Sequence, residues 1–160
     1  NIGILLNAMF LFLFYTTLTQ SKKDKKKKNR IGILLGLFVI VFHFLPQNGW
    51  TNESEGFKLM YISFLLLTVY CVTIYFIIAK EFYYLYKRAK TSLDENMAGN
   101  TKAFLSIMIG AELMIVFFLI MMIRSNVDSI SLQLSAFIIL VVAFGFFFVG
   151  FIQPTISKKE

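Results

Sequence analysis

The chain has 160 residues, of which 58% are hydrophobic and 16% are charged, and its mean hydropathy is +0.72. Because soluble domains are about half apolar, this composition indicates an integral membrane protein. The net charge of +7 comes from lysines outside the apolar segments, which indicates membrane topology and argues against nucleic-acid binding. The single cysteine, Cys71, excludes a disulfide framework and a Cys/His metal site, and is expected to lie in the helix core.

Apolar segments follow one another along the chain and predict an all-α integral membrane protein with about five transmembrane helices. Backbone groups in lipid must be satisfied within each segment, which favours helices, and the alternating pattern of a membrane barrel is missing from the sequence. The first segment lacks the basic start and cleavage site of a signal peptide, so we expect it to stay as a helix. The second is short and stops before Pro46, which leaves a full span or a broken helix open. The five segments are residues 2–18, 31–45, 59–78, 103–123 and 132–152.

Basic residues in the connecting segments predict the orientation of these helices. Fourteen of the sixteen Lys and Arg lie in residues 21–30, in residues 80–102 and at the C-terminal end, whereas the opposite side carries only Lys58 and Arg124. By the positive-inside rule, the fourteen lie on the cytoplasmic or matrix side. The lysine run is expected to act mainly as a topology signal, with binding of anionic lipid as an additional role of its lysines. Those are Lys22, Lys23, Lys25, Lys26, Lys27 and Lys28.

Few polar side chains lie within the apolar segments. His43 and Tyr70 are candidates for interhelical hydrogen bonds, and a lone histidine does not make a haem or metal site. Gly32 and Gly36 are spaced as in the GxxxG pattern that permits close helix contact. The sequence has no Ser/His/Asp set, phosphate-binding loop or metalloprotease motif, so we expect no catalytic site, metal or cofactor in this chain alone.

Glu112 is the one charged residue in residues 103–123 and lies about halfway along that segment. A carboxylate at the bilayer centre costs roughly 2.5 to 3.5 kcal/mol on insertion scales. Two interpretations remain open: a proton- or ion-handling group, or a hydrogen-bonded glutamic acid that holds two helices together. In either case we expect Glu112 to face protein or trapped water, with a polar group of another helix or another chain within reach.

The last three segments resemble a known family. Residues 100–114 (NTKAFLSIMIGAELM) resemble the second helix of NADH dehydrogenase subunit 4L, the NuoK family of respiratory complex I, which has an asparagine-led start and an [IL]-E-[LM]-[LM] core. Residues 136–143 (AFIILVVA), followed by Val149-Gly150-Phe151, resemble the family's third helix. The family's topology also agrees, and Lys87 and Arg88 fall where the arginines of its first loop lie. The resemblance covers roughly residues 60–158.

This resemblance implies a part of a proton pump that holds no redox cofactor. In the family, mid-membrane glutamates of the second and third helices belong to a chain of acids that links the quinone site to antiporter-like subunits. Glu112 would take the first of these roles, whereas Phe146 or a neighbour stands where the second glutamate is expected. The two segments before about residue 49 have no counterpart in the three-helix family.

The sequence and the resemblance together predict a membrane subunit of a respiratory NADH:quinone oxidoreductase, with other membrane subunits as partners. The alternatives are an accessory structural subunit of a respiratory complex and the membrane sensor domain of a signalling protein. We expect a division into an N-terminal extension, residues 1–56, with two apolar helices and a lysine-rich loop, and a 4L-like module, residues 57–160. The many Phe, Lys and Asn residues are typical of AT-rich organelle genomes, which favours the mitochondrial inner membrane over a prokaryotic cytoplasmic membrane.

Overall fold

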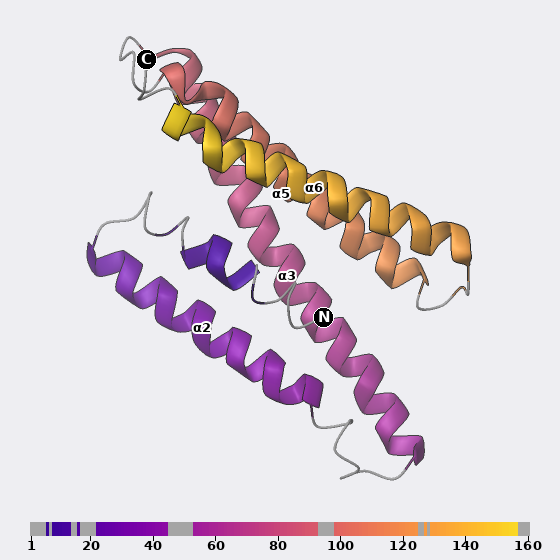
Figure 1. Ribbon diagram of the computed structural model, residues 1–160. Helices are drawn as coiled ribbons and strands as arrows, with labels where there is room; N and C mark the ends of the chain where they lie inside the picture. The colour runs from indigo at the N-terminus through magenta and orange to yellow at the C-terminus, as the bar shows by residue number, and fades with distance from the viewer. Residues whose placement is uncertain are drawn as a thin grey trace. The chain divides into compact units, whose positions relative to one another are not determined.

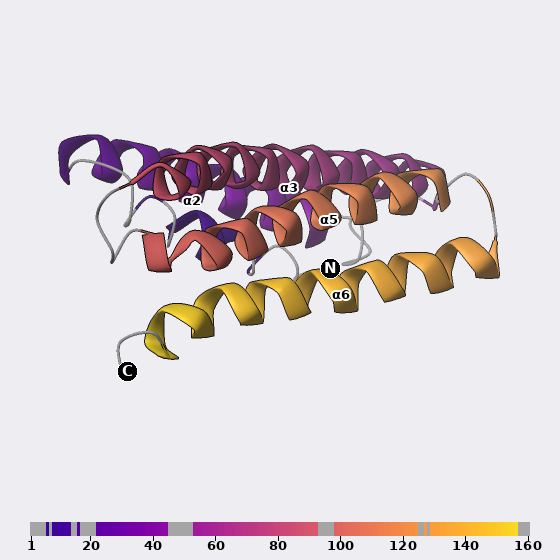
Figure 2. The ribbon, with the colours of Figure 1, turned by 90° about the horizontal axis from the view of Figure 1, so that it is seen from above.

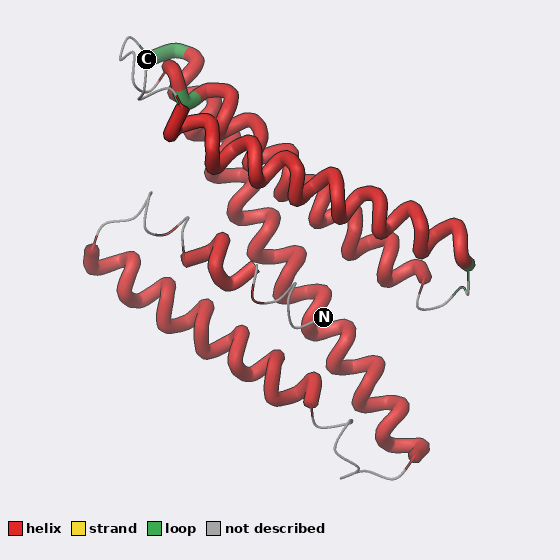
Figure 3. Tube along the Cα trace, in the orientation of Figure 1, coloured by secondary structure: helices red, strands yellow, loops and turns green. Residues whose placement is uncertain are grey.

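The computed structural model describes residues 6, 8–13, 16, 22–44, 53–92, 98–124, 127 and 129–156 (Figure 3). Within them the chain is all-α, as predicted, and no strand occurs among these residues. Residues 8–13 are helical, and four long helices follow (Figure 1). These are α2 (Lys22–Phe44), α3 (Glu53–Lys90), α5 (Thr101–Arg124) and α6 (Ile130–Ile156).

Three of these helices are long and apolar enough to cross a membrane: Tyr61–Lys90 of α3, Thr101–Arg124, and Ile130–Ile152 of α6. They correspond to the third, fourth and fifth predicted segments. The second segment is helical within α2, but its apolar part falls short of a span by length and composition. Most of the first segment lies outside the described residues.

The prediction of a lysine-rich loop is wrong, because the run of basic residues forms the first nine residues of α2. Lysine is among the better helix formers, and the run contains neither glycine nor proline. Repulsion between like charges four residues apart costs only about 0.2 to 0.5 kcal/mol per pair in water. The apolar helix that follows supplies the nucleus, so extending it through the lysines is favourable.

The helix α3 is also longer than the predicted apolar segment at both ends. Its 38 residues give a length of about 57 Å at 1.5 Å per residue, nearly twice the thickness of the hydrocarbon core of a bilayer. Its last turn carries Lys87, Arg88 and Lys90, where cations stabilise the carbonyl end of a helix. The first half of the predicted connector at residues 80–102 is therefore helix.

The chain divides into two compact units, an N-terminal unit, Asn1–Ile74, and a C-terminal unit, Tyr75–Glu160. This division falls inside α3, whereas the domain boundary predicted at residues 56–57 falls in its first turns and stays a prediction. The C-terminal unit contains the end of α3 and an antiparallel hairpin of α5 and α6, which run side by side in Figures 1 and 2.

Small residues let α5 and α6 approach closely. A Cβ atom on Gly150 would lie 2.5 Å from Ile107 Cγ1, and one on Gly110 would lie 3.2 Å from the carbonyl oxygen of Ala143. The buried small residues of α6, Ala136, Ala143 and Gly150, are seven positions apart. This spacing keeps one stripe of the helix toward its partner, as small residues do in membrane helix pairs.

Aromatic rings fill the space between α3 and this hairpin. Tyr75 of α3 has an exposed fraction of 0%, and its ring centroid lies 6.2 Å from that of Phe118 and 6.3 Å from that of Phe147. Toward the other end of the unit, the rings of Phe82 and Phe104 lie 6.0 Å apart. These contacts fix which face of α5 points into the unit and which points away from it.

Candidate functional site

Glu112 lies at the middle of α5, eleven residues after Thr101 and twelve before Arg124. At 1.5 Å per residue, the carboxylate-bearing residue is about 17 Å from either end of the helix. The helix α5 is apolar and long enough to cross a membrane, and such a span would set Glu112 near the bilayer centre. The helix begins at Thr101, directly after Asn100.

The packed face of α5 is the face opposite Glu112. Gly110, Ala111 and Met114 are buried within the C-terminal unit, whereas the Glu112 side chain is exposed. One and two turns further along the same face, Val116 and Leu119 are also exposed, at 42% and 49%. We call residues 112, 116 and 119, with Ile123 at 55% exposure, the outer face of α5.

No side chain in the described part of the chain pairs with Glu112. The hydrogen bonds and ring contacts that hold α5 in its unit involve other residues of the helix. The polar partner predicted for Glu112, a group of another helix or of another chain, is therefore not found among the described residues of the C-terminal unit and stays a prediction. The described residues also contain no group of three or more metal-ligating side chains, so Glu112 stands apart from any such cluster there.

Tyr70 forms the interhelical hydrogen bond for which it was a candidate. Its hydroxyl group donates to the backbone carbonyl of Gly32 in α2, at 2.9 Å. Cβ atoms built at Gly32 and Gly36 would meet Phe12 at 2.5 Å and Met9 at 2.8 Å, so both glycines lie at close contacts of the N-terminal unit. Gly32 and Gly36 thus lie on a packing surface of α2, where the Phe12 ring and the Met9 thioether pack against the helix backbone.

The structure describes the side chain of Cys71 but not that of His43. Cys71 is a free thiol with an exposed fraction of 0%, as expected for a small core residue. His43 lies in the last turn of α2, and its side chain is outside the part of the structure that is described. Its predicted interhelical role stays a prediction.

The lysines predicted to bind anionic lipid lie on the first turns of α2. Lys26, Lys27 and Arg30 are exposed, and together with Ile31 they line a shallow hollow on the surface. The side chains of Lys22, Lys23 and Lys25 are outside the described ones. A row of basic groups that ends in an apolar residue is the arrangement typical of the membrane interface, so binding of anionic lipid there stays a prediction.

One polar pair was missed by the sequence analysis. At the end of α5, Arg124 Nη2 donates a hydrogen bond to Gln133 Oε1 in α6, at 2.9 Å. The two residues are nine positions apart across the turn of a helical hairpin, so their meeting depends on the turn and the register. The available signal was positional, since Arg124 ends one apolar segment and Gln133 lies in the first turn of the next.

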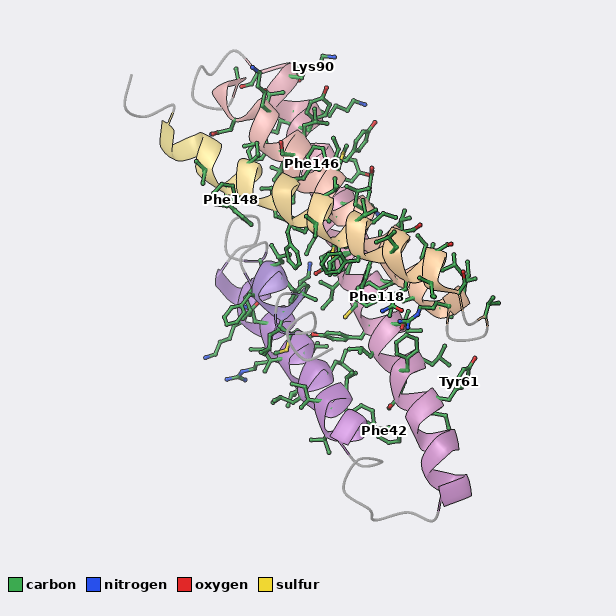
Figure 4. The ribbon with its side chains drawn as sticks, turned by 45° about the vertical axis from the view of Figure 1, so that its right-hand side comes forward. Phe42, Tyr61, Lys90, Phe118, Phe146 and Phe148 are labelled. Carbon is green, nitrogen blue, oxygen red and sulfur yellow. The ribbon has the colours of Figure 1, made fainter. Side chains whose placement is uncertain are left out.

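The structure describes Phe146, the residue at or next to which the resemblance would set a second glutamate. Phe146 is half-buried on α6, and Phe148, two residues further along, is exposed (Figure 4). Within the described spans, residues 103–123 and 132–152, Glu112 is the only acidic residue. No protein-family model matches the chain, and neither the curated proteins nor the solved structures compared with it include a match.

Proposed function

We propose that this chain is a membrane subunit of a larger proton-translocating complex, in which Glu112 supplies a protonatable group at an interface with another membrane chain. The observation that carries the proposal is the exposure of Glu112 at the middle of a transmembrane helix, on the face that turns away from its own unit. The resemblance of residues 100–114 to subunit 4L supports a respiratory NADH:quinone oxidoreductase as this complex. Its membrane would be the mitochondrial inner membrane or a prokaryotic cytoplasmic membrane.

The free-energy cost of the Glu112 carboxyl group depends on what surrounds it in the membrane. Left against acyl chains at the bilayer centre, an acidic residue costs roughly 2.5 to 3.5 kcal/mol, and intramembrane acids accordingly face protein or water. The neighbouring side chains on the outer face of α5, Val116, Leu119 and Ile123, are aliphatic and offer it no hydrogen bond. A helix of another chain, bearing a polar side chain or bordering trapped water, would offset that cost.

The carboxyl group of Glu112 can bind and release a proton at such an interface. It is the only side chain of this outer face that can take up or release a proton, because its neighbours there are aliphatic. A protonated carboxyl group donates a hydrogen bond, and an ionised one accepts hydrogen bonds. The group can therefore stay hydrogen-bonded in both protonation states of a relay. The remaining acids of the relay would belong to other subunits, since residues 59–78, 103–123 and 132–152 contain no other acidic side chain.

A second function is favoured by the same isolation of Glu112. A relay needs several proton-binding groups, whereas a single hydrogen bond between two helices needs only one. An accessory subunit in which Glu112 binds a polar group of a neighbouring chain, with no proton transfer, also accounts for its exposure. The two functions differ in what they require of the carboxyl group.

Two substitutions of Glu112 separate these functions in the assembled complex in its native membrane. Glu112→Gln keeps the shape and the hydrogen-bonding capacity but removes the titratable proton, so the proton-transfer function predicts normal assembly and strongly reduced proton translocation. The structural function predicts that Gln is nearly silent, and that Glu112→Leu weakens assembly by the value of an interhelical hydrogen bond, about 0.6 to 2 kcal/mol. Val141→Leu, an apolar change at a position of α6 that is 55% exposed, serves as the matched control and should alter neither property.

The measurement combines the amount of assembled complex with proton translocation per electron pair. Normal translocation by a fully assembled Glu112→Gln complex would contradict the relay and favour the accessory function. Because an acid of a neighbouring subunit can replace a missing group, the Gln variant is also combined with removal of the acid nearest to Glu112 in the assembled complex. If that double variant also translocates protons normally, Glu112 has no part in proton transfer.

A further inference from the structure

A hollow lies between α5 and α6 at the end of the hairpin where Arg124 and Gln133 meet. Its lining is apolar apart from these two side chains, and it opens outward. The lining residues are Phe117, Met121, Arg124, Ile130, Gln133, Leu134, Ala136, Phe137 and Leu140. Several residues of its rim are exposed, Ile130 by 85% and Phe137 by 62%, so the hollow borders the surroundings of the helices.

The sequence explains why the hairpin opens at this end. The antiparallel contacts bring Ala103 and Ile107 against Gly150, and Gly110 against Ala143, so small residues face the partner helix at both levels. The next level, seven residues further along α5 and seven back along α6, pairs Phe117 with Ala136. A phenylalanine in place of a small residue holds the helices apart, and space is left beside its ring.

The depth of the hollow matches one leaflet of a bilayer. Arg124 lies twelve residues, or about 18 Å, from the middle of α5, just beyond the half-thickness of about 15 Å of the hydrocarbon core. Its guanidinium group is therefore at the level of the headgroup phosphates. Phe117 and Leu140 are each seven residues deeper than the polar pair, by about 10 Å, so the apolar part of the hollow lies at the level of the acyl chains.

The charge at the mouth of the hollow selects the headgroup. Gln133 Oε1 accepts one of the five N–H donors of the Arg124 guanidinium and thereby orients the fork, and no carboxylate of the described residues is bonded to it. Arginine binds phosphate through two parallel hydrogen bonds, which a fixed fork favours. The structure assigns this hollow as a binding site for an anionic phospholipid, with its phosphate on Arg124 and an acyl chain along Phe117, Met121 and Leu140.

This site is separate from the lysine run of α2 and from Glu112, and it does not rest on the proposed function. By the positive-inside rule Arg124 lies on the side opposite to the lysines, so the lipid would come from the other leaflet. Arg124 is one of only two basic residues predicted on that side, so this leaflet has little other basic charge to bind an anionic headgroup.

The test uses the full chain reconstituted in phosphatidylcholine vesicles that contain a photoactivatable lipid, either phosphatidylglycerol or phosphatidylcholine, with the reactive group in the acyl chain. Labelled peptides are identified by mass spectrometry. For peptides that contain Met121 or Leu140 we expect about fivefold more labelling by the phosphatidylglycerol probe, the factor given by one basic group near a headgroup. Arg124→Gln should abolish this preference. Lys102→Gln removes one charge from the other end of the same helix and should leave the preference intact.

Labelling by the phosphatidylcholine probe checks that the hollow still forms in the Arg124→Gln protein, because an acyl chain enters it whichever headgroup it bears. Arg124→Lys keeps the charge but not the fork, and should retain only part of the preference. Equal labelling by the two probes in the unchanged protein would overturn the assignment. So would a preference that survives Arg124→Gln, or one that Lys102→Gln removes equally.

Discussion

Gly150→Leu is expected to force α5 and α6 apart and to lower the free energy of unfolding of the C-terminal unit by about 3 kcal/mol, the upper end for overpacking of a well-packed site. A Cβ atom at this position already lies 2.5 Å from Ile107 Cγ1 and 3.1 Å from the carbonyl oxygen of Ala103. Ile107 is β-branched and held in one rotamer on its helix, and the carbonyl belongs to the backbone, so neither can give way cheaply. The effect is measured by reversible SDS titration in mixed micelles, with a dye pair at the ends of α5 and α6 reporting their separation.

Gly145→Leu is the matched control on the same helix. Nothing lies within 4 Å of a Cβ atom at Gly145, so the larger side chain enters open space, and the helix gains from losing a glycine. Its unfolding free energy should stay within about 0.5 kcal/mol of the unchanged protein or rise slightly. Equal destabilisation by the two substitutions would contradict the close approach of α5 and α6 at Gly150. It would also contradict the outward orientation of Glu112, because that orientation follows from the packing of the other face of α5 against α6.

Tyr75→Ala has the second-largest expected effect. The ring of Tyr75 is fully buried between Phe118 and Phe147, and removing it leaves a cavity among three helices. Lipid tails are as apolar as the core, so the cost in a membrane comes from lost packing and not from transfer out of water. A cavity of about 100 Å³ at about 24 cal/mol per Å³ gives about 2.4 kcal/mol.

The control for Tyr75→Ala is the next residue along α3, which lies about 100° further around the helix. Phe76 is 61% exposed, so Phe76→Ala removes a ring that faces the surroundings and should cost less than about 0.5 kcal/mol in the same titration. A loss for Phe76→Ala as large as that for Tyr75→Ala would contradict the orientation of α3 in the C-terminal unit.

Hydropathy predicted the three long apolar helices and the place of Glu112 at the middle of one of them, because both depend on residue type along one helix. It misplaced the ends of α3 and the start of α2, since hydropathy reports where the chain leaves lipid and not where the helix stops. Lysine and other good helix formers continue a helix into water, as Lys22–Arg30 of α2 shows.

The direction in which Glu112 points could not be predicted from α5 alone. In a membrane both the packed face and the lipid face of a helix are apolar, so the pattern of Ile, Leu, Met and Phe around Glu112 carries little directional signal. The better signal lies in the small residues, because Ala103 and Gly110 are seven apart on α5, as are Ala136, Ala143 and Gly150 on α6. That stripe marks the contact between the two helices and places Glu112 outside it.

The central claim is that another membrane chain covers the outer face of α5 at Glu112, and site-specific photo-crosslinking in intact native membranes tests it most directly. A photoreactive amino acid replaces Val116, one turn from Glu112 on the same face, or Val141, which is 55% exposed at the middle of α6. Both positions lie at mid-membrane depth. We predict that Val116 crosslinks to one integral membrane protein, that Glu112→Leu reduces this product, and that Val141 gives lipid adducts. Lipid adducts alone at Val116 would contradict the account.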